Sequence, residues 1–176
     1  MLPKFLRRRG LRRKPRLFVD MDGTLCEWRQ VDTEELYKEG YFERLRPQQG
    51  VIDAVNKINS DGIFDVYILT HYLGDSPTAQ REKAVWKDKY LPHVNIIYVK
   101  CGSNKAEAVE RIFGKKITRD DILLDDYTEN LRAWKEAGGT ALKLLNDVNN
   151  TNGTWEGLRI HMDECKAVLQ TAIEMA

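Results

Sequence analysis

The sequence predicts an α/β fold of the doubly wound, Rossmann-like type, with a five-stranded parallel sheet and a small helical cap inserted after the first strand. Three observations lead to this prediction. Short apolar runs alternate with helical periodicities from Arg16 onward, acidic and hydroxyl residues follow several of these runs, and the connection after the first run is unusually long. Such alternation is typical of β-α-β units, whose ligands bind at the carboxyl ends of the strands.

Length and composition are those of one globular domain. The 176 residues are 42% hydrophobic and 31% charged, which is enough for a sizeable core without an apolar run of about 18 residues that would cross a membrane. The three cysteines, Cys26, Cys101 and Cys165, have spacings that match no zinc pattern. We therefore expect reduced thiols, a cytoplasmic location and no membrane association.

The first residues form a basic arm that carries no acidic side chain. Its cations are Lys4, Arg7, Arg8, Arg9, Arg12, Arg13 and Lys14. Because the arm lacks interleaved aromatic residues and serines, we expect residues 1–15 to be a disordered tail and residues 16–176 to be a single domain. Nucleic-acid binding or organelle targeting through the arm is a less favoured alternative, and oligomerisation is left open.

The first strand, Leu17–Met21, carries the expected catalytic motif. In an extended strand, residues two apart share a face, so Asp20 and Asp22 converge at its carboxyl end. Two carboxylates so close require a cation, and a hard divalent ion such as Mg²⁺ prefers oxygen ligands. Gly23 lets the backbone turn, and Thr24 offers a hydroxyl and an N–H group to an anion.

Four more apolar runs have the composition of strands buried on both faces. They are Phe64–Leu69, Val94–Val99, Ile122–Leu124 and Thr140–Leu145. Three helical patterns separate them. Two cover Pro47–Ser60 and Asn104–Phe113, and a third begins with Ser76 as the N-cap and Pro77 as the first helical residue. A polar loop, Asn146–Gly157, precedes a closing helix striped by Cys165, Val168, Leu169 and Ala172.

The connection after the first strand contains an insertion. Forty residues lie between Gly23 and Phe64, and the crossover helix accounts for about the last 17 of them. The remainder, about residues 25–46, is rich in aromatic side chains and is expected to fold over the strand ends as a cap.

Two strand ends and one helix supply candidate anion contacts. Thr70 ends the second strand and is a phosphate-binding candidate, although a strand-end threonine commonly satisfies its own backbone. His71 either contacts the ligand or is an ordinary loop histidine. Lys83 lies on a helical stripe with Trp86, where it either meets an anion or extends its ammonium group past the ring to water. Lys105, at the start of the next helix, either reaches the anion or is solvated.

The fourth strand ends in a second carboxylate pair. Asp125 is expected to complete the metal site begun by Asp20. Asp126 has a mixed role, because Asp126 and Glu129 have the spacing of a capping box at a helix start.

Taken in strand order, the Asp20–Thr24 motif, Thr70, Lys105 and the Asp125–Asp126 pair resemble the four motifs of the haloacid dehalogenase (HAD) superfamily over residues 16–145. Within it, the chain is most similar to the 5'(3')-deoxyribonucleotidase family. The local patterns that carry this likeness are Gly40–Pro47 leading to Gly50, Glu82–Tyr90 and Leu124–Asp126.

The resemblance implies specific roles. Asp20 is implied as the nucleophile and Asp22 as the general acid/base. Thr70, Lys83 and Lys105 are implied as phosphate contacts, and the metal ligands are Asp20, Asp125 and the backbone carbonyl of Asp22. His71 stands where the family commonly has serine, and the cap looks shorter.

The chemistry expected of these residues is phosphoryl transfer, which needs an in-line nucleophile, cations on the phosphate and a proton for the leaving oxygen. We therefore predict a Mg²⁺-dependent phosphomonoesterase with an aspartyl-phosphate intermediate, acting on a small-molecule phosphomonoester such as a nucleoside monophosphate. Alternatives are another small phosphomonoester, a polynucleotide end bound with the basic arm, or a non-catalytic binding module on a HAD scaffold. The intact Asp20, Asp22 and Asp125 disfavour the last.

Overall fold

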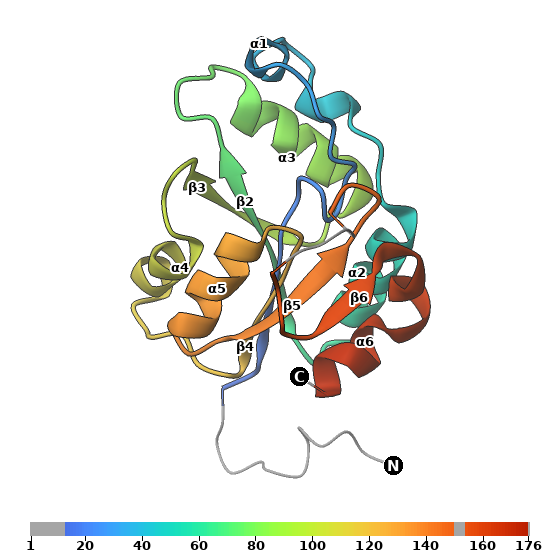
Figure 1. The fold of residues 1–176 in the computed structure, drawn as a ribbon, viewed down its shortest axis with the longest axis vertical. Helices are drawn as coiled ribbons and strands as arrows, with labels where there is room; N and C mark the ends of the chain where they lie inside the picture. Colours follow the sequence, from blue (N-terminus) through green and yellow to red (C-terminus); the bar gives the residue numbers. More distant parts are fainter. Residues whose placement is uncertain (1–12, 150–153, 176) are drawn as a thin grey trace.

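The computed structural model describes residues 13–149 and 154–175, and these form a parallel sheet covered by helices on both faces (Figure 1). The strands are β1 Arg16–Val19, β2 Asp65–Tyr72, β3 Asn95–Lys100, β4 Asp121–Asp125, β5 Thr140–Leu145 and β6 Arg159–His161. The α-helices are α1 Thr33–Leu36, α2 Gln49–Asp61, α3 Ala79–Tyr90, α4 Lys105–Phe113, α5 Thr128–Glu136 and α6 Cys165–Met175, and the short 3₁₀ helices are η2 Phe42–Arg44 and η3 Met162–Glu164.

The sheet has the strand order β3-β2-β1-β4-β5-β6, and all its strands are parallel. This confirms the predicted doubly wound α/β fold, but the sheet has six strands rather than five. The strand that sequence analysis missed, β6, has only three residues and pairs with one neighbour, at the sheet edge. Three residues are too few for an alternating hydrophobic pattern to be recognised.

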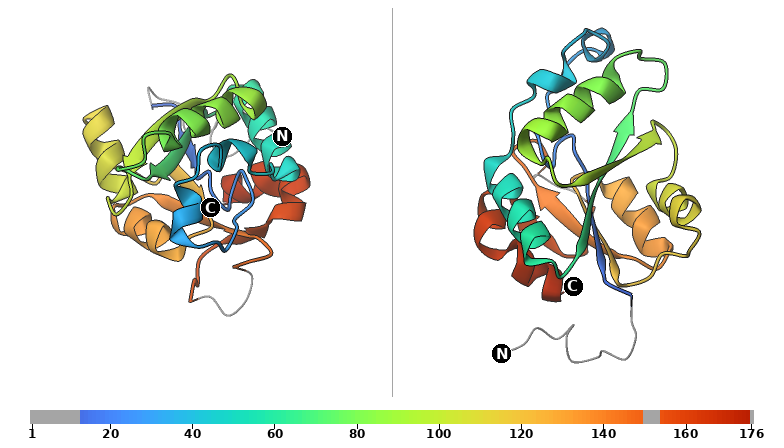
Figure 2. Two further views of the ribbon diagram at one scale, coloured as in Figure 1. Left: turned by 90° about the horizontal axis from the view of Figure 1, so that it is seen from above. Right: turned by 180° about the vertical axis from the view of Figure 1, so that it is seen from behind.

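Helices α4 and α5 cover one face of the sheet, and α2 and α6 cover the other, as the rear view in Figure 2 shows. Two hydrophobic clusters fill the two layers. The larger contains the buried residues of α2, α3 and α6, and the smaller those of α4 and α5. Strand β1 lies at the centre with all four residues buried, so both clusters pack against it.

Parallel register brings the chemically important residues to one edge. Val19 is paired with Ile68 of β2 and with Leu124 of β4, so the residues that follow all three meet at the carboxyl edge of the sheet. The Asp20 N–H group donates to the Leu124 carbonyl at 2.9 Å and extends this alignment beyond the strand.

Two expected helix details are wrong. Helix α3 begins at Ala79 instead of Pro77, with Thr78 at the N-cap position, although the Ser76 hydroxyl accepts from the Ala79 N–H group at 3.2 Å. In α6, Val168 is 42% exposed, and Ile173 is buried beside Cys165 and Leu169 instead. Ala172 is half-buried and packs against the larger hydrophobic cluster, so the predicted stripe is correct except at Val168.

Residues 25–46 contain α1 and η2 and lie beside α3, at the top of Figure 1. The buried residues Tyr41, Phe42 and Leu45 join the larger hydrophobic cluster, so this insertion is packed against the body of the protein.

The predicted N-terminal tail lies mostly outside the described residues, which start at Arg13. Arg13 and Arg16 both bind the buried Asp121 carboxylate, with an N···O distance of 2.6 Å in each pair, and Lys14 pairs with Asp65 at 2.9 Å. All three cysteines are free thiols; Cys26 and Cys165 are buried. Among the described helices, none has the length and apolar character needed to cross a membrane.

Candidate active site

The loop after β1 brings the carboxylates of Asp20 and Asp22 to different partners. Asp20 is buried, whereas the Asp22 side chain is partly exposed. Between them, the Met21 side chain is buried and its carbonyl accepts hydrogen bonds from the N–H groups of Thr24, Leu25 and Cys26 at 2.9–3.2 Å. The loop is therefore tightly wound, and it directs the carboxylates in separate directions.

Gly23 is required at its position in this loop. Its φ angle is +81°, in the left-handed region that favours glycine, and a Cβ atom there would lie 2.4 Å from Oδ2 of Asp126. The glycine therefore allows the loop after β1 and the loop after β4 to approach each other.

Lys105, the first residue of α4, joins Asp20 to Asp125. Its Nζ atom lies 2.5 Å from Oδ1 of Asp20 and 2.8 Å from Oδ2 of Asp125, and the residue is only 2% exposed. The Asn104 side chain caps this helix by accepting from the Ala106 N–H group at 2.8 Å, which sets the start of the helix at Lys105. The solvated alternative for Lys105 is therefore wrong.

The protonation of this group follows from burial and charge. Burial by itself would lower the pKa of Lys105, but the Asp125 and Asp20 carboxylates reverse this and raise it above the usual range. Burial also raises the pKa of Asp20 well above its usual value, against the opposing effect of Lys105 and with a further increase from Asp125.

Three carboxylates gather where a cation would be expected. Asp20, Asp125 and Asp126 each offer an oxygen within 4.8 Å of the others. Asp125 is anchored because it accepts from the Tyr127 N–H group at 2.8 Å and from the Asn130 amide at 3.0 Å. Burial, followed by the charge of Asp125, raises the pKa of Asp126 to about 7. An all-oxygen donor set with excess negative charge fits a hard divalent cation such as Mg²⁺.

The capping box expected at Asp126 and Glu129 is wrong. Helix α5 starts at Thr128 with Tyr127 at the N-cap position, and no side chain of residues 13–149 or 154–175 caps it. Asp126 instead faces Gly23 and accepts from Asn146 Nδ2 at 3.2 Å. Tertiary contacts thus direct its carboxylate toward the site.

Lys83 reaches the site from α3. Its side chain is fully buried, its Nζ atom donates to Asp22 Oδ2 and, at 2.9 Å, to the Thr70 hydroxyl, and the Phe42 ring covers it at 4.7 Å. The alternative in which Lys83 extends past Trp86 to water is therefore wrong, and the predicted inward stripe is confirmed in Ala79, Lys83 and Trp86.

Thr70 bonds to its own backbone neighbour, as the structural alternative expected, and it also contacts Lys83. The buried Thr70 hydroxyl donates to the His71 carbonyl at 3.2 Å while accepting from Lys83. His71 Nε2 lies 2.9 Å from the Ser103 carbonyl. Burial and then the nearby Lys105 lower the pKa of His71, so the ring is neutral at pH 7 and Nε2 donates to that carbonyl.

The structure adds Asn146, which sequence analysis assigned only to a polar loop. Its side-chain amide donates to the Gly23 carbonyl at 2.7 Å and to Asp126, so it ties together the loops after β1 and β4. The contact spans 123 positions, and no local pattern indicates it. Trp155, from the same predicted loop, is buried in the smaller hydrophobic cluster with Trp134. The buried Thr24 hydroxyl has no hydrogen-bond partner among the residues that the structure describes.

Known nucleotidases are similar to this chain in sequence. The family model described as "5' nucleotidase, deoxy (Pyrimidine), cytosolic type C protein" matches residues 27–170. A protein of Vibrio phage KVP40, provisionally named a 5'(3')-deoxyribonucleotidase, is 27% identical over 129 residues, which cover 66% of this chain and 69% of the phage protein.

Two solved structures share the fold. The D,D-heptose 1,7-bisphosphate phosphatase of B. bronchiseptica, complexed with magnesium and phosphate, aligns with a TM-score of 0.66 at 13% identity, over 92% of this chain and 99% of that one. A HAD-superfamily hydrolase of Ehrlichia chaffeensis aligns with a TM-score of 0.58 at 13% identity, again over 92% and 99% of the two chains.

Proposed function

This chain belongs to the family of cytosolic type C 5'-nucleotidases and is a HAD-type phosphatase, and from this we propose that it hydrolyses nucleoside monophosphates in a Mg²⁺-dependent reaction through an aspartyl phosphate on Asp20. The observation that carries the proposal is the meeting of three carboxylates and the buried Lys105 at the end of β1. A nucleophile beside a cation, with a separate acid/base nearby, is what phosphoryl transfer requires.

The proposed reaction has two steps. A carboxylate oxygen of Asp20 forms a bond to phosphorus, the bond from phosphorus to the nucleoside oxygen breaks, and Asp22 donates a proton to that oxygen. Water then attacks the aspartyl phosphate, its proton passes to Asp22, and inorganic phosphate leaves with Asp20 restored. What supports these separate roles is that Asp20 contacts Lys105, whereas Asp22 contacts Lys83.

Lysines and hydroxyls of the protein hold the transferring phosphoryl group. Lys105 and Lys83 supply positive charge from two helices, and the hydroxyls of Thr70 and Thr24 supply hydrogen bonds. Because every one of these groups is buried, their interactions with a dianion are screened less than they would be in water.

The proposed metal ligands are the carboxylates of Asp20 and Asp125, with Asp126 nearby and the backbone carbonyl of Asp22 as the family resemblance implies. When bound, Mg²⁺ neutralises these carboxylates and the charge on the phosphoryl oxygens. We also interpret residues 25–46 as a small cap within one HAD domain, since they pack over α3 at the same end of the sheet.

A phosphatase panel with Mg²⁺ tests the proposal. Its members are 5'- and 3'-deoxynucleotides, ribonucleotides, sugar phosphates and phosphorylated oligonucleotides, and release of inorganic phosphate is measured for each. We expect mononucleotides to have the highest kcat/KM and chelator to abolish turnover. Asp20→Asn should be inactive, whereas the matched change Asp61→Asn, on the outer face of α2, should have wild-type activity. A preference for sugar phosphates or oligonucleotide ends would contradict the nucleotide assignment.

A further inference from the structure

The insertion is fastened to α3 by a buried carboxylate, and we propose that Glu82 is a positioning residue for phosphate binding. It holds the Gly40–Phe42 turn over Lys83 and thereby sets the affinity of the site for a phosphate monoester. The inference deepens the proposed function, because it takes Lys83 as a contact to the substrate phosphate.

Glu82 uses both carboxylate oxygens on the backbone of one turn. Oε1 accepts from the Gly40 N–H group at 2.7 Å, and Oε2 accepts from the Phe42 N–H group at 3.1 Å. Glu82 is 1% exposed, and within residues 13–149 and 154–175 it forms no ion pair. A buried carboxylate is costly unless hydrogen bonds compensate it, so these two N–H groups and the first turn of α3 stabilise Glu82 in its buried position.

The next residue on α3 is Lys83, and the same turn contacts it from the other side. The Phe42 ring lies 4.7 Å from Lys83 Nζ, which donates to Thr70 and Asp22. A ring face over an ammonium group attracts it and excludes water from it. Glu82 therefore fixes the Phe42 backbone, and the Phe42 ring limits the directions in which Lys83 can point.

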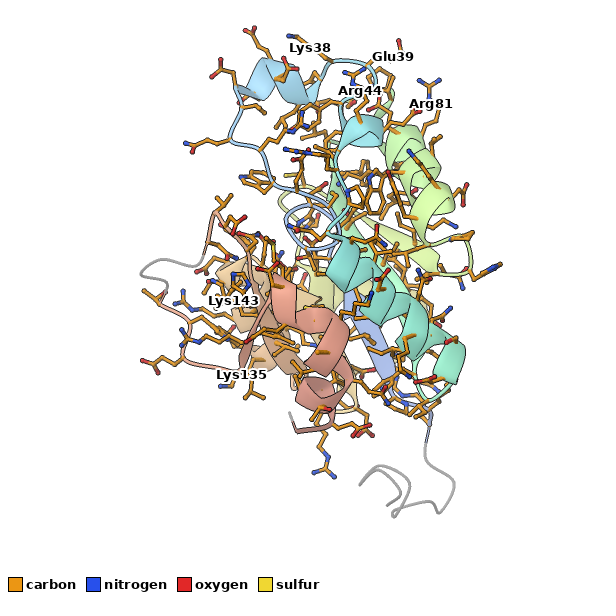
Figure 3. The ribbon with its side chains drawn as sticks, turned by 90° about the vertical axis from the view of Figure 1, so that its right-hand side faces the viewer. Lys38, Glu39, Arg44, Arg81, Lys135 and Lys143 are labelled. Atoms are coloured by element: carbon orange, nitrogen blue, oxygen red, sulfur yellow. The ribbon has the colours of Figure 1, made fainter. Side chains whose placement is uncertain are left out.

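Two further contacts show that the interface has a buried and an exposed part. Trp86, one turn along α3, donates from Nε1 to the Leu45 carbonyl at 2.8 Å and is fully buried. At the outer end, Arg81 and Glu39 pair at 2.8 Å with side chains 64% and 77% exposed, and Figure 3 shows both at the solvent-facing end of the insertion. The Glu39 carboxylate thus joins the same two elements as Glu82. Unlike Glu82 and Lys83, however, it is exposed to solvent.

This difference supplies a matched control. Glu82→Gln and Glu39→Gln are the same substitution at one interface, and Glu82→Ala removes both acceptors. The two hydrogen bonds from the Gly40 and Phe42 N–H groups to Glu82 are called the clamp, and amide hydrogen exchange of these two residues measures it. The kcat and KM for a nucleoside monophosphate with Mg²⁺ measure its consequence. Calorimetric titration with inorganic phosphate gives the affinity without turnover.

In Glu82→Ala we expect the Gly40 and Phe42 amides to exchange roughly ten- to hundredfold faster, with the β1 amides unchanged. KM and the phosphate dissociation constant should rise about three- to tenfold, and kcat should change less, because Asp20 lies on β1 and not on the clamp. Glu82→Gln, which keeps one acceptor, should be intermediate, and Glu39→Gln should match wild type.

Wild-type phosphate affinity and KM in Glu82→Ala, despite faster exchange of the two amides, would overturn the positioning role. Unchanged exchange of these amides would overturn the clamp itself. If wild-type protein hydrolyses no phosphomonoester, the proposed function fails, and the phosphate titration still decides the role of Glu82. Should Glu82→Ala not fold, Glu82→Gln gives the same comparison.

Discussion

Replacing Lys105 by methionine should expose how strongly the site depends on one buried cation. The substitution keeps most of the length of the side chain and removes the charge that lies 2.5 Å from Asp20 and 2.8 Å from Asp125. Removing one partner of a buried ion pair costs about 3–5 kcal/mol, because the remaining charge is left uncompensated. At roughly 2–4 °C per kcal/mol for a chain of this size, the melting temperature should fall by about 6–20 °C.

The measurement is thermal unfolding in chelator at pH 8 and at pH 5. The loss should be larger at pH 8 than at pH 5. Burial raises the pKa of Asp20 and the variant lacks the cation that opposed this increase, so at the lower pH the carboxyl takes up a proton instead. Added Mg²⁺ should restore part of the loss at pH 8, since it brings positive charge to the same oxygens.

Lys116→Met is the matched control. Lys116 pairs with Glu110 at 2.7 Å, a distance similar to those of Lys105, but its side chain is 87% exposed. Solvent screens such a pair, so the control should melt like wild type. Equal melting temperatures for Lys105→Met and wild type at pH 8 would refute the view that Lys105 compensates the buried carboxylates.

Three further predictions concern the carboxylates and the turn between them. Asp20→Asn should abolish turnover, whereas Asp22→Asn should give a stoichiometric burst of nitrophenolate from p-nitrophenyl phosphate and a protein heavier by one phosphoryl group; wild-type nucleotide turnover in either variant would contradict the assigned roles. Gly23→Ala should lower the free energy of unfolding by about 1–3 kcal/mol and the activity about tenfold or more, because the added Cβ would lie 2.4 Å from Asp126 at a φ of +81°. Urea unfolding and steady-state kinetics measure the two effects, and an unchanged variant would mean that the loop relaxes freely. Metal-free protein should lose stability as the pH rises from about 4 through about 7, because the pKa of Asp126 is raised to about 7 and folding therefore takes up a proton in that window. Mg²⁺ should reduce this dependence on pH. Urea unfolding in chelator that shows rising stability over the same range would argue against the prediction.

Several features of the site were predictable because they depend on short stretches of chain. An apolar run that ends in Asp20 and Asp22 specifies a buried strand with charge at its carboxyl end. Helical spacing with Ala79 and Trp86 places Lys83 on the inward face of α3. Asp125 is the last residue of β4, which ends at the same edge of the sheet. All strands of a parallel sheet end at one edge, so local patterns and the fold class placed Asp20 and Asp125 at the same edge.

Contacts between distant segments decided the rest. Asp126 has the spacing of a helix cap, but its carboxylate is drawn to the loop after β1, because Gly23 leaves space for it and Asn146 donates to it. Glu82 reads as an ordinary charged helix residue until the Gly40–Phe42 turn is placed against it.

The sequence by itself determined the fold class, the strand that ends in Asp20 and Asp22, and the helical stripe that carries Lys83, since periodicity and strand ends are local properties. Only the tertiary structure decided the sixth strand, the partner of each lysine and the residues that hold the insertion in place. A hydrogen bond between residues 40 and 82, or between 23 and 146, depends on the packing of whole elements, and no residue pattern along the chain encodes that distance.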